Sequence, residues 1–314
     1  MFGTYRLILA MLVALTHFGF QYHHAGFGSP AVVSFYMLSG VLMQRQFAKF
    51  QSRGPGAGTV FLVDRFLRVA PIYWAVSLLV LFTAGGENLV QNFALLPLNY
   101  QAFTGATPLI FTAWSLANEL HFYILLPLLA LCSSRAIKTI MWLSLCVFVA
   151  GPFLPQPTWW SYEGWPGTFF VFMAGMLYAR GESLRSLFIA AALLLAVFVA
   201  AVIAHAPLHL GINVHVCVGM LAVLMILPRL DRLPQRPWDT HLGALSFPLF
   251  LCHPWVMQFT GWKNVAALAL ASLLVSAAFA LAVEWPSDRF RYWARRRVQP
   301  AHDARLAHPG TRRA

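Results

Sequence analysis

The sequence predicts an all-α, polytopic membrane protein with about ten transmembrane helices. Only 10% of its 314 residues are charged and 59% are hydrophobic, whereas a soluble domain carries about 25% charged residues. Too few charges remain to cover a water-exposed surface. The apolar residues form stretches whose length is close to that of a membrane-spanning helix. Such a helix needs roughly 20 residues to cross a hydrocarbon core about 30 Å thick. The bilayer is therefore the expected solvent, and one membrane domain over residues 1–288 is the simplest account.

The apolar stretches give the expected helices in order. They lie near residues 4–22, 30–48, 68–84, 109–131, 136–152, 166–181, 186–204, 210–228, 242–260 and 264–284. The first is expected to be a span and not a cleaved signal peptide, because the residues after its apolar run, including Thr16 and His17, offer no small-residue cleavage site. The third and the sixth are short and contain or adjoin proline or glycine.

Positive charge predicts the orientation of these helices. Basic residues follow the second, fourth, sixth, eighth and tenth helices, and the opposite connections hold only Lys263. Lysine and arginine concentrate in the cytoplasmic connections of membrane proteins. We therefore expect an even number of spans with both termini in the cytoplasm. Residues 289–314 are predicted to be a basic, disordered cytoplasmic tail that contacts anionic lipid.

Other classes of protein fit the composition poorly. The formal charge of +12 does not indicate nucleic-acid binding, because the charge lies in short runs between apolar stretches and forms no basic face with interleaved aromatic residues. The four cysteines lie inside apolar stretches, where thiols act as small hydrophobic groups. The histidines are scattered along the chain, so no metal site is expected. Membrane lipid is the expected surrounding, and the oligomeric state stays open.

Aromatic residues are frequent in the connections predicted to face outward. The segment 85–108 is the longest of these connections, and 159–165 is the most aromatic. One interpretation is an interfacial belt, because Trp and Tyr concentrate at the boundary between lipid and water. The other interpretation is a platform on which sugar rings stack. The sequence leaves both open.

Two ionisable residues share one face of the first expected helix. Arg6 and His17 are eleven residues apart, a spacing that returns to within about 20° of the same direction over a rise of about 16 Å. A guanidinium near the cytosolic surface could hold nucleotide phosphates while a pantetheine-like arm reaches the deeper imidazole. The alternative is that Arg6 only sets topology and that His17 is a structural polar contact between helices.

The fourth expected helix carries a carboxylate at a similar depth. Ionisable groups inside a span cost at least about 2.5 kcal/mol on insertion scales, so they are functional candidates. We expect Glu119 to orient the His17 ring and to stabilise its protonated form, as a general base that deprotonates a hydroxyl requires. Ser115 lies one turn away on the same face. The alternative is a structural contact between helices.

Arginines also precede the third expected helix. Arg65 and Arg68 are three residues apart, so they project from one helical face at the cytosolic surface. Arginine suits bidentate contact with phosphate. Ordinary cytoplasmic topology charge explains the same spacing, so both interpretations stand.

Together these segments resemble the membrane-bound acyltransferase-3 family, bacterial enzymes that O-acylate surface and secreted glycans. The resemblance runs from Arg6 to about Pro286. Its elements are Arg-x10-His at 6–17, SFYMLSGV at 34–41, RFLRVAPIYW at 65–74, WSLANELHFY at 114–123 and LGALSFPLFLCHP at 242–254. Val41 and Phe250 depart from the family's usual Phe and Tyr. The chain resembles the stand-alone form, without a hydrolase-like domain after the membrane part.

The resemblance implies roles for particular residues. His17 is the expected catalytic histidine with Glu119 beside it, and Arg6, Arg65 and Arg68 are the expected ligands of the coenzyme A phosphates. The residues expected to contact substrate or to support the site are Ser39, Tyr73, Trp114, Ser115, Tyr123 and His253. For His253, packing and catalysis are both open.

The predicted function is that of an inner-membrane O-acyltransferase. It moves an acyl group, with acetyl expected, from acyl-CoA to a hydroxyl of a carbohydrate or glycolipid acceptor. One alternative is a transporter or flippase of glycans or lipids, because buried His, Glu and Arg residues also line such paths. A weaker alternative is a non-catalytic subunit. The acceptor, the acyl length, the membrane side and the choice between direct transfer and an acyl-enzyme stay open.

Overall fold

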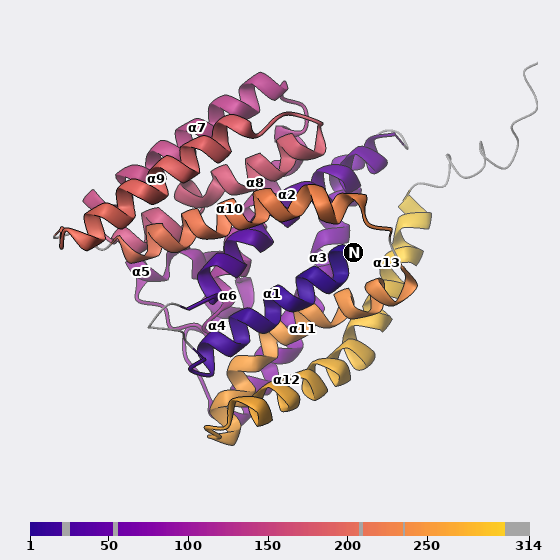
Figure 1. The fold of residues 1–314 in the computed structure, drawn as a ribbon. Helices are drawn as coiled ribbons and strands as arrows, with labels where there is room; N and C mark the ends of the chain where they lie inside the picture. The colour runs from indigo at the N-terminus through magenta and orange to yellow at the C-terminus, as the bar shows by residue number, and fades with distance from the viewer. Residues whose placement is uncertain (21–25, 53–55, 207–209, 235, 299–314) are drawn as a thin grey trace, which may run out of the picture.

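The protein is helical throughout the part of the chain that the computed structural model describes, residues 1–20, 26–52, 56–206, 210–234 and 236–298. No strand occurs within these ranges, so the predicted all-α class is confirmed (Figure 1). The long helices are α1 (Phe2–His17), α2 (Gly28–Gln51), α3 (Ala57–Ala84), α6 (Ala113–Leu129), α7 (Ser134–Ala150), α8 (Trp165–Ala179), α9 (Arg185–Ile203), α10 (Gly211–Arg232), α11 (Pro237–Thr260), α12 (Val265–Phe279) and α13 (Trp285–Val298).

Short helical turns fill two of the connections and one junction. Between α3 and α6 lie α4 (Leu89–Ala94), a 3₁₀ turn (Leu96–Tyr100) and α5 (Gln101–Thr104). Between α7 and α8 lie a 3₁₀ turn (Gly151–Phe153) and a π-helical turn (Trp159–Glu163). A second π-helical turn, Ala280–Glu284, joins α12 to α13.

Each of the ten predicted ranges overlaps one long helix. Within the described ranges, six helical segments are long and apolar enough to cross a membrane: Ala57–Ala84, Ser134–Phe153, Arg185–Ile203, Gly211–Arg232, Pro237–Thr260 and Val265–Trp293. The apolar helix Phe2–His17 is shorter. These lengths and compositions are those of an integral membrane protein. The number of ten crossings and the cytoplasmic position of both termini stay predictions.

Two predicted boundaries are corrected. Helix α3 begins at Ala57 and not near residue 68, so Arg65 and Arg68 lie inside a helix. Its first turns pack Phe61 into the core, and the buried charge of Asp64 is compensated by an ion pair with Arg65. The division predicted at residue 289 falls inside α13, so residues 289–298 are helical and not part of a disordered tail. Residues 299–314 of that predicted tail lie outside the described residues.

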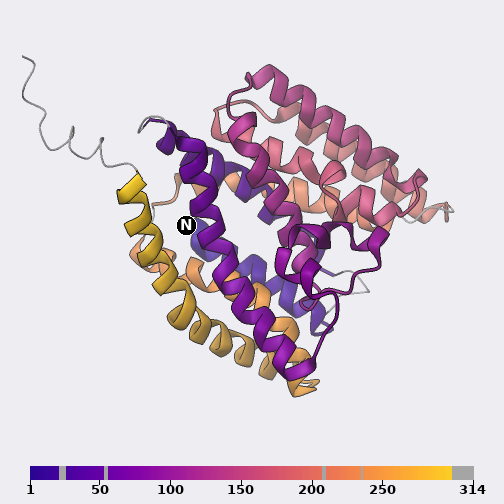
Figure 2. The same cartoon turned by 180° about the vertical axis from the view of Figure 1, so that it is seen from behind.

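Helices α1, α2 and α11 run through the middle of the molecule, between a flank of α7, α8 and α9 and an opposite flank of α12 and α13 (Figures 1 and 2). Close backbone contacts set these crossings. A Cβ atom on Gly3 would lie 1.9 Å from the carbonyl oxygen of Asp239, and one on Gly40 would lie 2.2 Å from that of Phe172. Small residues let membrane helices approach in this way. The contacts bring α1 against α11 and α2 against α8.

A carboxylate fixes the start of α1 on α11. Asp239 accepts hydrogen bonds from the backbone N–H groups of Gly3 and Thr4, at 3.1 and 2.8 Å, and from the Thr4 hydroxyl at 2.7 Å. The first N–H groups of a helix lack partners within the helix, so a carboxylate there stabilises the end. These bonds hold the rotation of α1 and therefore the directions in which its side chains point.

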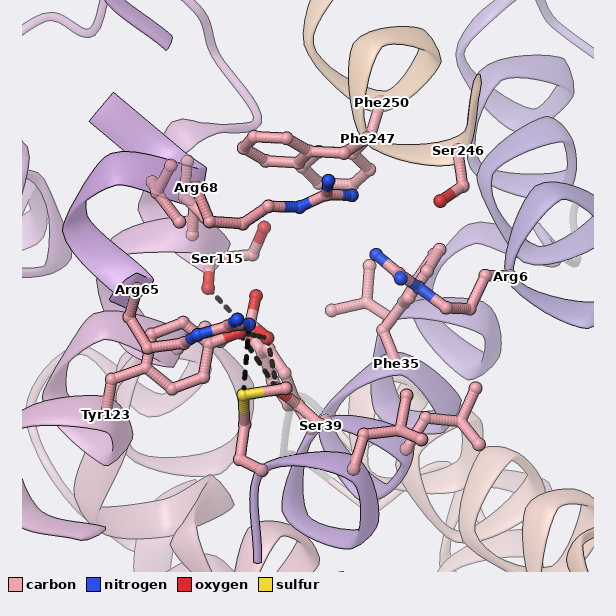
Figure 3. A pocket seen from close by; sticks show the side chains of 18 residues that line it. Arg6, Phe35, Ser39, Arg65, Arg68, Ser115, Tyr123, Ser246, Phe247 and Phe250 are labelled. Carbon is pink, nitrogen blue, oxygen red and sulfur yellow. Dashed lines mark hydrogen bonds between the residues drawn. The ribbon is translucent and has the colours of Figure 1, made fainter. Parts of the chain in front are cut away.

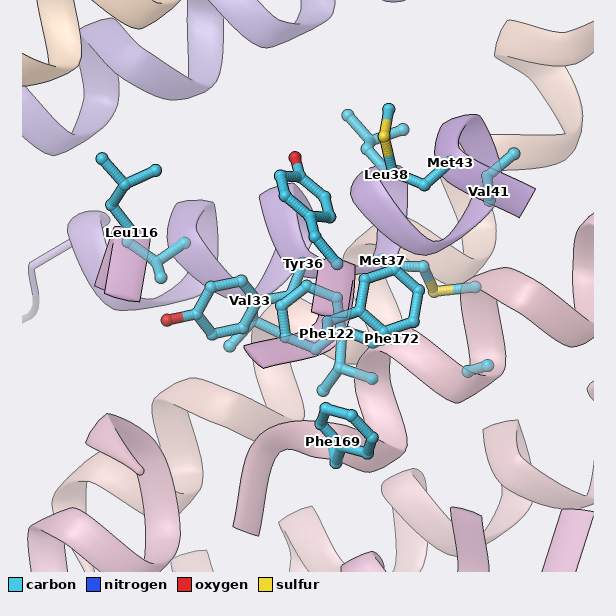
Figure 4. Packing of buried hydrophobic residues seen from close by; sticks show 14 of the residues in the cluster. Val33, Tyr36, Met37, Leu38, Val41, Met43, Leu116, Phe122, Phe169 and Phe172 are labelled. Atoms are coloured by element: carbon cyan, nitrogen blue, oxygen red, sulfur yellow. The ribbon is translucent and has the colours of Figure 1, made fainter. Parts of the chain in front are cut away.

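Aromatic packing fixes α2, α6 and α8 against one another (Figure 4). The Phe172 ring stacks on Tyr36 and on Phe122, with ring centroids 4.6 and 4.7 Å apart. Phe122, Phe172 and Met37 are fully buried. Because Phe122 lies three residues after Glu119, and Tyr36 three residues before Ser39, this cluster positions the polar side chains that lie nearby.

Candidate functional site

A large internal cavity opens between α1, α2, α3, α6 and α11, with an empty volume of about 840 Å³ that includes the part continuous with the exterior. We call it the arginine cavity, because Arg6, Arg65 and Arg68 all line it. Figure 3 shows the three guanidinium groups converging from two helices, with Ser39, Ser115 and Tyr123 nearby. The structure thus brings together the three arginines that the sequence singled out.

The three arginines have different partners. Arg65 forms an ion pair with Asp64, and its Nη1 donates to the Met43 sulfur at 3.3 Å. Arg68 pairs with Glu284 and, at 3.4 Å, with Asp288. Arg6 makes no hydrogen bond and no ion pair with any described residue. The cavity therefore holds one guanidinium free to bind an anion beside two that already have carboxylate partners.

The arginine cavity contains one further carboxylate. The Oε1 atom of Glu119 accepts short hydrogen bonds from the Ser39 and Tyr123 hydroxyls, and those two hydroxyls are 3.2 Å apart. The carboxylate faces the arginine cavity, where its charge partly offsets that of the three arginines.

The predicted pairing of Glu119 with His17 is wrong. His17 contacts His253 on α11, with its Nδ1 atom 2.8 Å from Nε2 of His253 and the two ring planes within 6° of parallel. The reason lies in helix packing. The main neighbours of α1 are α11 and α2, whereas α6 packs against α2, α3 and α8. Glu119 and His17 were expected at similar depths in the membrane, but their helices do not pack against each other in a way that pairs the two side chains.

Hydrogen bonding fixes how the two histidines share protons. The Nδ1 atom of His253 lies 3.0 Å from the carbonyl oxygen of Leu249, which can only accept, so this nitrogen carries a proton. His253 is fully buried, and neither ring contacts a carboxylate of the described chain, so a charged ring here would be poorly compensated. In the neutral pair, Nε2 of His253 accepts from Nδ1–H of His17. The Nε2 atom of His17 is left with a free lone pair.

A second cavity is lined by His17 and has an empty volume of about 480 Å³, which includes space open to the exterior. Of the described residues that line it, none is Asp, Glu, Lys or Arg, so we call it the neutral cavity. Val32, Ser115 and Phe250 line both cavities. A single layer of side chains therefore separates the arginine cavity from the neutral cavity, and His17 lines the neutral cavity.

The other predicted site residues divide between the two cavities and the scaffold. Ser39 and Tyr123 line the arginine cavity, Trp114 the neutral cavity and Ser115 both. Tyr73 lines neither. Its hydroxyl donates to the carbonyl oxygen of Asn92 at 2.9 Å, which ties α3 to α4.

Two features of the site were not predicted from the sequence. The first is the His17–His253 pair, which no spacing along the chain signals because 236 residues separate the two histidines. The second is the pairing of Arg68 with Glu284 and Asp288. Those two carboxylates are four residues apart, so their place on one helical face beside a basic helix was a usable signal.

The fold and the site define a class: a helical integral membrane protein in which a cation-lined cavity shares part of its wall with a neutral cavity, and a paired histidine lines the neutral cavity. A family model described as an acyltransferase domain, that of the acyltransferase-3 family, matches residues 4–287. The chain therefore belongs to this family of membrane acyltransferases, as the sequence motifs predicted. Neither the comparison with curated proteins nor that with solved structures gives a match.

Proposed function

We propose that the protein moves an acyl group, acetyl being the expected one, from acyl-CoA to a hydroxyl of a carbohydrate or glycoconjugate. In this proposal ten helices cross the bacterial inner membrane and both termini face the cytoplasm. The observation that carries it is the arrangement of a cation-rich cavity one side-chain layer away from a histidine with a free ring nitrogen.

The arginine cavity suits the acyl-CoA donor. Coenzyme A carries several phosphate charges, and Arg6 offers an unpaired guanidinium to them while Arg65 and Arg68 reach the same cavity from α3. Arg6 and His17 lie on one helix about 16 Å apart along its axis. With the phosphates at Arg6, an extended pantetheine arm can bring the thioester toward His17.

The chemistry then follows from the free lone pair of His17. Its Nε2 atom takes the proton of the acceptor hydroxyl as the oxygen attacks the thioester carbonyl carbon. The C–O bond forms, the C–S bond breaks, and the leaving thiolate takes the proton back from the His17 ring. His253 accepts the Nδ1–H bond throughout, so it holds the ring in one orientation and tautomer, the role that a carboxylate has in other catalytic histidine pairs. This route needs no acyl-histidine.

Glu119 has a different role from the one its position in the sequence suggested. Hydrogen-bonded to Ser39 and Tyr123, it holds both hydroxyls toward the donor and limits the repulsion among the three guanidinium groups. It acts on donor binding and not on proton transfer.

Acyl transfer by the purified protein tests the proposal. The protein is reconstituted in nanodiscs with radiolabelled acetyl-CoA and a glycan extract, and labelled product is separated from free donor. Transfer that is present in the wild type and lost in His17→Ala supports the enzyme. Arg45→Ala serves as the matched control, because Arg45 pairs with Asp231 outside both cavities at 2.6 Å. Movement of intact glycan across the membrane without product would instead support the transporter alternative.

A further inference from the structure

The neutral cavity differs from the arginine cavity in the hydrogen bonds it offers. The hydroxyl protons of Thr16 and Ser115 are committed to backbone carbonyl oxygens of Leu12 and Thr112, both at 2.9 Å. Each of these hydroxyl oxygens keeps lone pairs that can accept. The ring nitrogen of His17 that faces no protein partner is also an acceptor. The Trp114 indole N–H and the hydroxyls of Ser29 and Tyr162 add donors to the same lining. A ligand that fills this cavity must therefore both donate and accept hydrogen bonds.

Charge narrows the class of ligand further. The described lining of the neutral cavity carries no cationic side chain, and an anionic group held there would lose its hydration without an opposite charge to compensate it. A cationic group would meet no carboxylate. The lining therefore favours an uncharged ligand.

Aromatic rings give the cavity an apolar wall. The Trp114 and Tyr162 rings pack edge to face with centroids 5.0 Å apart, and Phe111 packs edge-on against the His17 ring at 4.8 Å. Flat apolar surface beside hydrogen-bond acceptors suits a ring that has one carbon-rich face and several hydroxyls.

We propose that the neutral cavity is the acceptor site and that it selects an uncharged polyhydroxyl ring, a neutral sugar unit. The ring lies against Trp114 and Tyr162, and the reacting hydroxyl donates its hydrogen bond to Nε2 of His17. Sugars that bear a carboxylate or an ammonium group at the reacting ring are excluded. This inference rests on the acyltransferase proposed above and adds to it the place and the charge class of the acceptor.

A set of matched acceptors tests the selection. Wild-type protein in nanodiscs receives labelled acetyl-CoA with a neutral methyl hexoside, with the methyl uronide that differs by a carboxylate, or with the corresponding amino sugar. We expect transfer to the neutral glycoside to exceed transfer to either charged one by about tenfold or more, the cost of one poorly compensated charge. Equal or better transfer to the uronide would overturn the inference while leaving the acyltransferase intact.

Two variants locate the site. Trp114→Leu should raise KM for the neutral glycoside about tenfold, because a stacking surface is lost, and leave KM for acetyl-CoA unchanged. Phe247→Leu is the matched control, since Phe247 lines only the arginine cavity, and it should not change KM for the acceptor. An unchanged acceptor KM in Trp114→Leu would place the acceptor elsewhere.

A binding measurement separates this inference from the proposed activity. If no glycoside becomes labelled, calorimetry with the same three glycosides decides. If only the neutral glycoside binds, and if Trp114→Leu weakens that binding, the neutral cavity selects uncharged sugars as proposed. The same result without labelled product would speak against acyl transfer. Absence of such binding, or tighter binding of the uronide, overturns the inference.

Discussion

The arginine cavity and the neutral cavity share part of one wall but differ in almost every other respect. Three guanidinium groups and a carboxylate line the first, and the described lining of the second carries neither. The first can select a ligand by charge over a long distance, whereas the second must select by shape and by hydrogen bonds at contact. Under the proposed function, this difference assigns two unlike substrates to the two cavities, and His17 lines the neutral one.

The origin of the charges explains why only one cavity has them. Arg6 lies in the first turns of α1, and Arg65 and Arg68 lie in the first half of α3. Arginines at such helix ends are the residues that set topology. In this protein they also line a cavity. The same arginines can therefore both determine membrane topology and bind an anion, so the two interpretations do not exclude each other. The neutral cavity lies near the opposite end of α1, where His17 is the last helical residue.

The largest expected effect on catalysis comes from substitution of His17. His17→Ala removes the proposed base, so kcat should fall about 10³-fold, near the middle of the range for general acid–base catalysis. KM for acetyl-CoA should stay the same, because the arginine cavity is untouched. Steady-state kinetics in nanodiscs measures both values. A variant that retains a tenth or more of wild-type kcat would rule out His17 as the base.

His253 should have the next largest effect. His253→Ala leaves the Nδ1–H group of His17 without an acceptor, and kcat should fall about 10²-fold with little change in either KM. His253→Gln can supply an amide oxygen and should recover part of the loss. The pH profile of kcat should also shift in both variants. Equal loss of activity and of thermal stability in the two variants would indicate a purely structural role.

Arg6 separates donor binding from chemistry. Arg6→Ala should raise KM for acetyl-CoA about 30-fold and change kcat little, because a charge-assisted contact with phosphate contributes about 1.5–3 kcal/mol. Arg6→Lys should recover part of the affinity, and added salt should weaken donor binding more in the wild type than in Arg6→Ala. An effect of Arg6→Ala on acceptor KM alone would reverse the assignment of the two cavities.

Glu284 should have a smaller effect of opposite sign. Its carboxylate pairs with Arg68, so it competes with any phosphate for that guanidinium. Glu284→Gln should lower KM for acetyl-CoA about threefold, a gain reduced because Asp288 also lies within 3.4 Å of Arg68. Titration with acetyl-CoA measures this KM in Glu284→Gln, and Asp288→Asn is measured beside it as the companion variant. A higher KM in Glu284→Gln would show that the pair positions Arg68 for the donor.

The elements of the fold were largely readable from the sequence because hydrophobic length is a local property. One exception is the start of α3, where Asp64, Arg65 and Arg68 lower the local hydropathy although the helix continues through them. The other is residues 289–298, whose basic sequence predicted a tail although α13 continues through them. The family motifs likewise named the arginines that the structure gathers around one cavity.

The partner of His17 was not readable in the same way. Counting residues from the membrane surface gives the depth of a side chain, but it gives neither the direction in which the side chain points nor which helix packs beside it. Glu119 has a suitable depth, yet α1 packs against α11, and His253 takes the place beside the ring. Helix rotation depends on contacts such as the Asp239 cap of α1, which are distant in sequence.

The smallest expected effect comes from a charge pair that belongs to neither cavity. Lys138 donates to Glu182 at 2.6 Å, and this hydrogen bond lowers the pKa of Glu182. Lys138→Ala should leave kcat and both KM values unchanged and lower Tm by no more than about 2 °C. A depressed carboxyl pKa stabilises the fold above the pKa of the unfolded chain and ceases to do so as pH falls through the folded-state value. The difference in Tm should therefore be present near neutral pH and vanish in acid.

A change of either KM in Lys138→Ala would show that charge outside the arginine cavity also governs binding. The contrast between the two cavities would then no longer explain how the two substrates are separated.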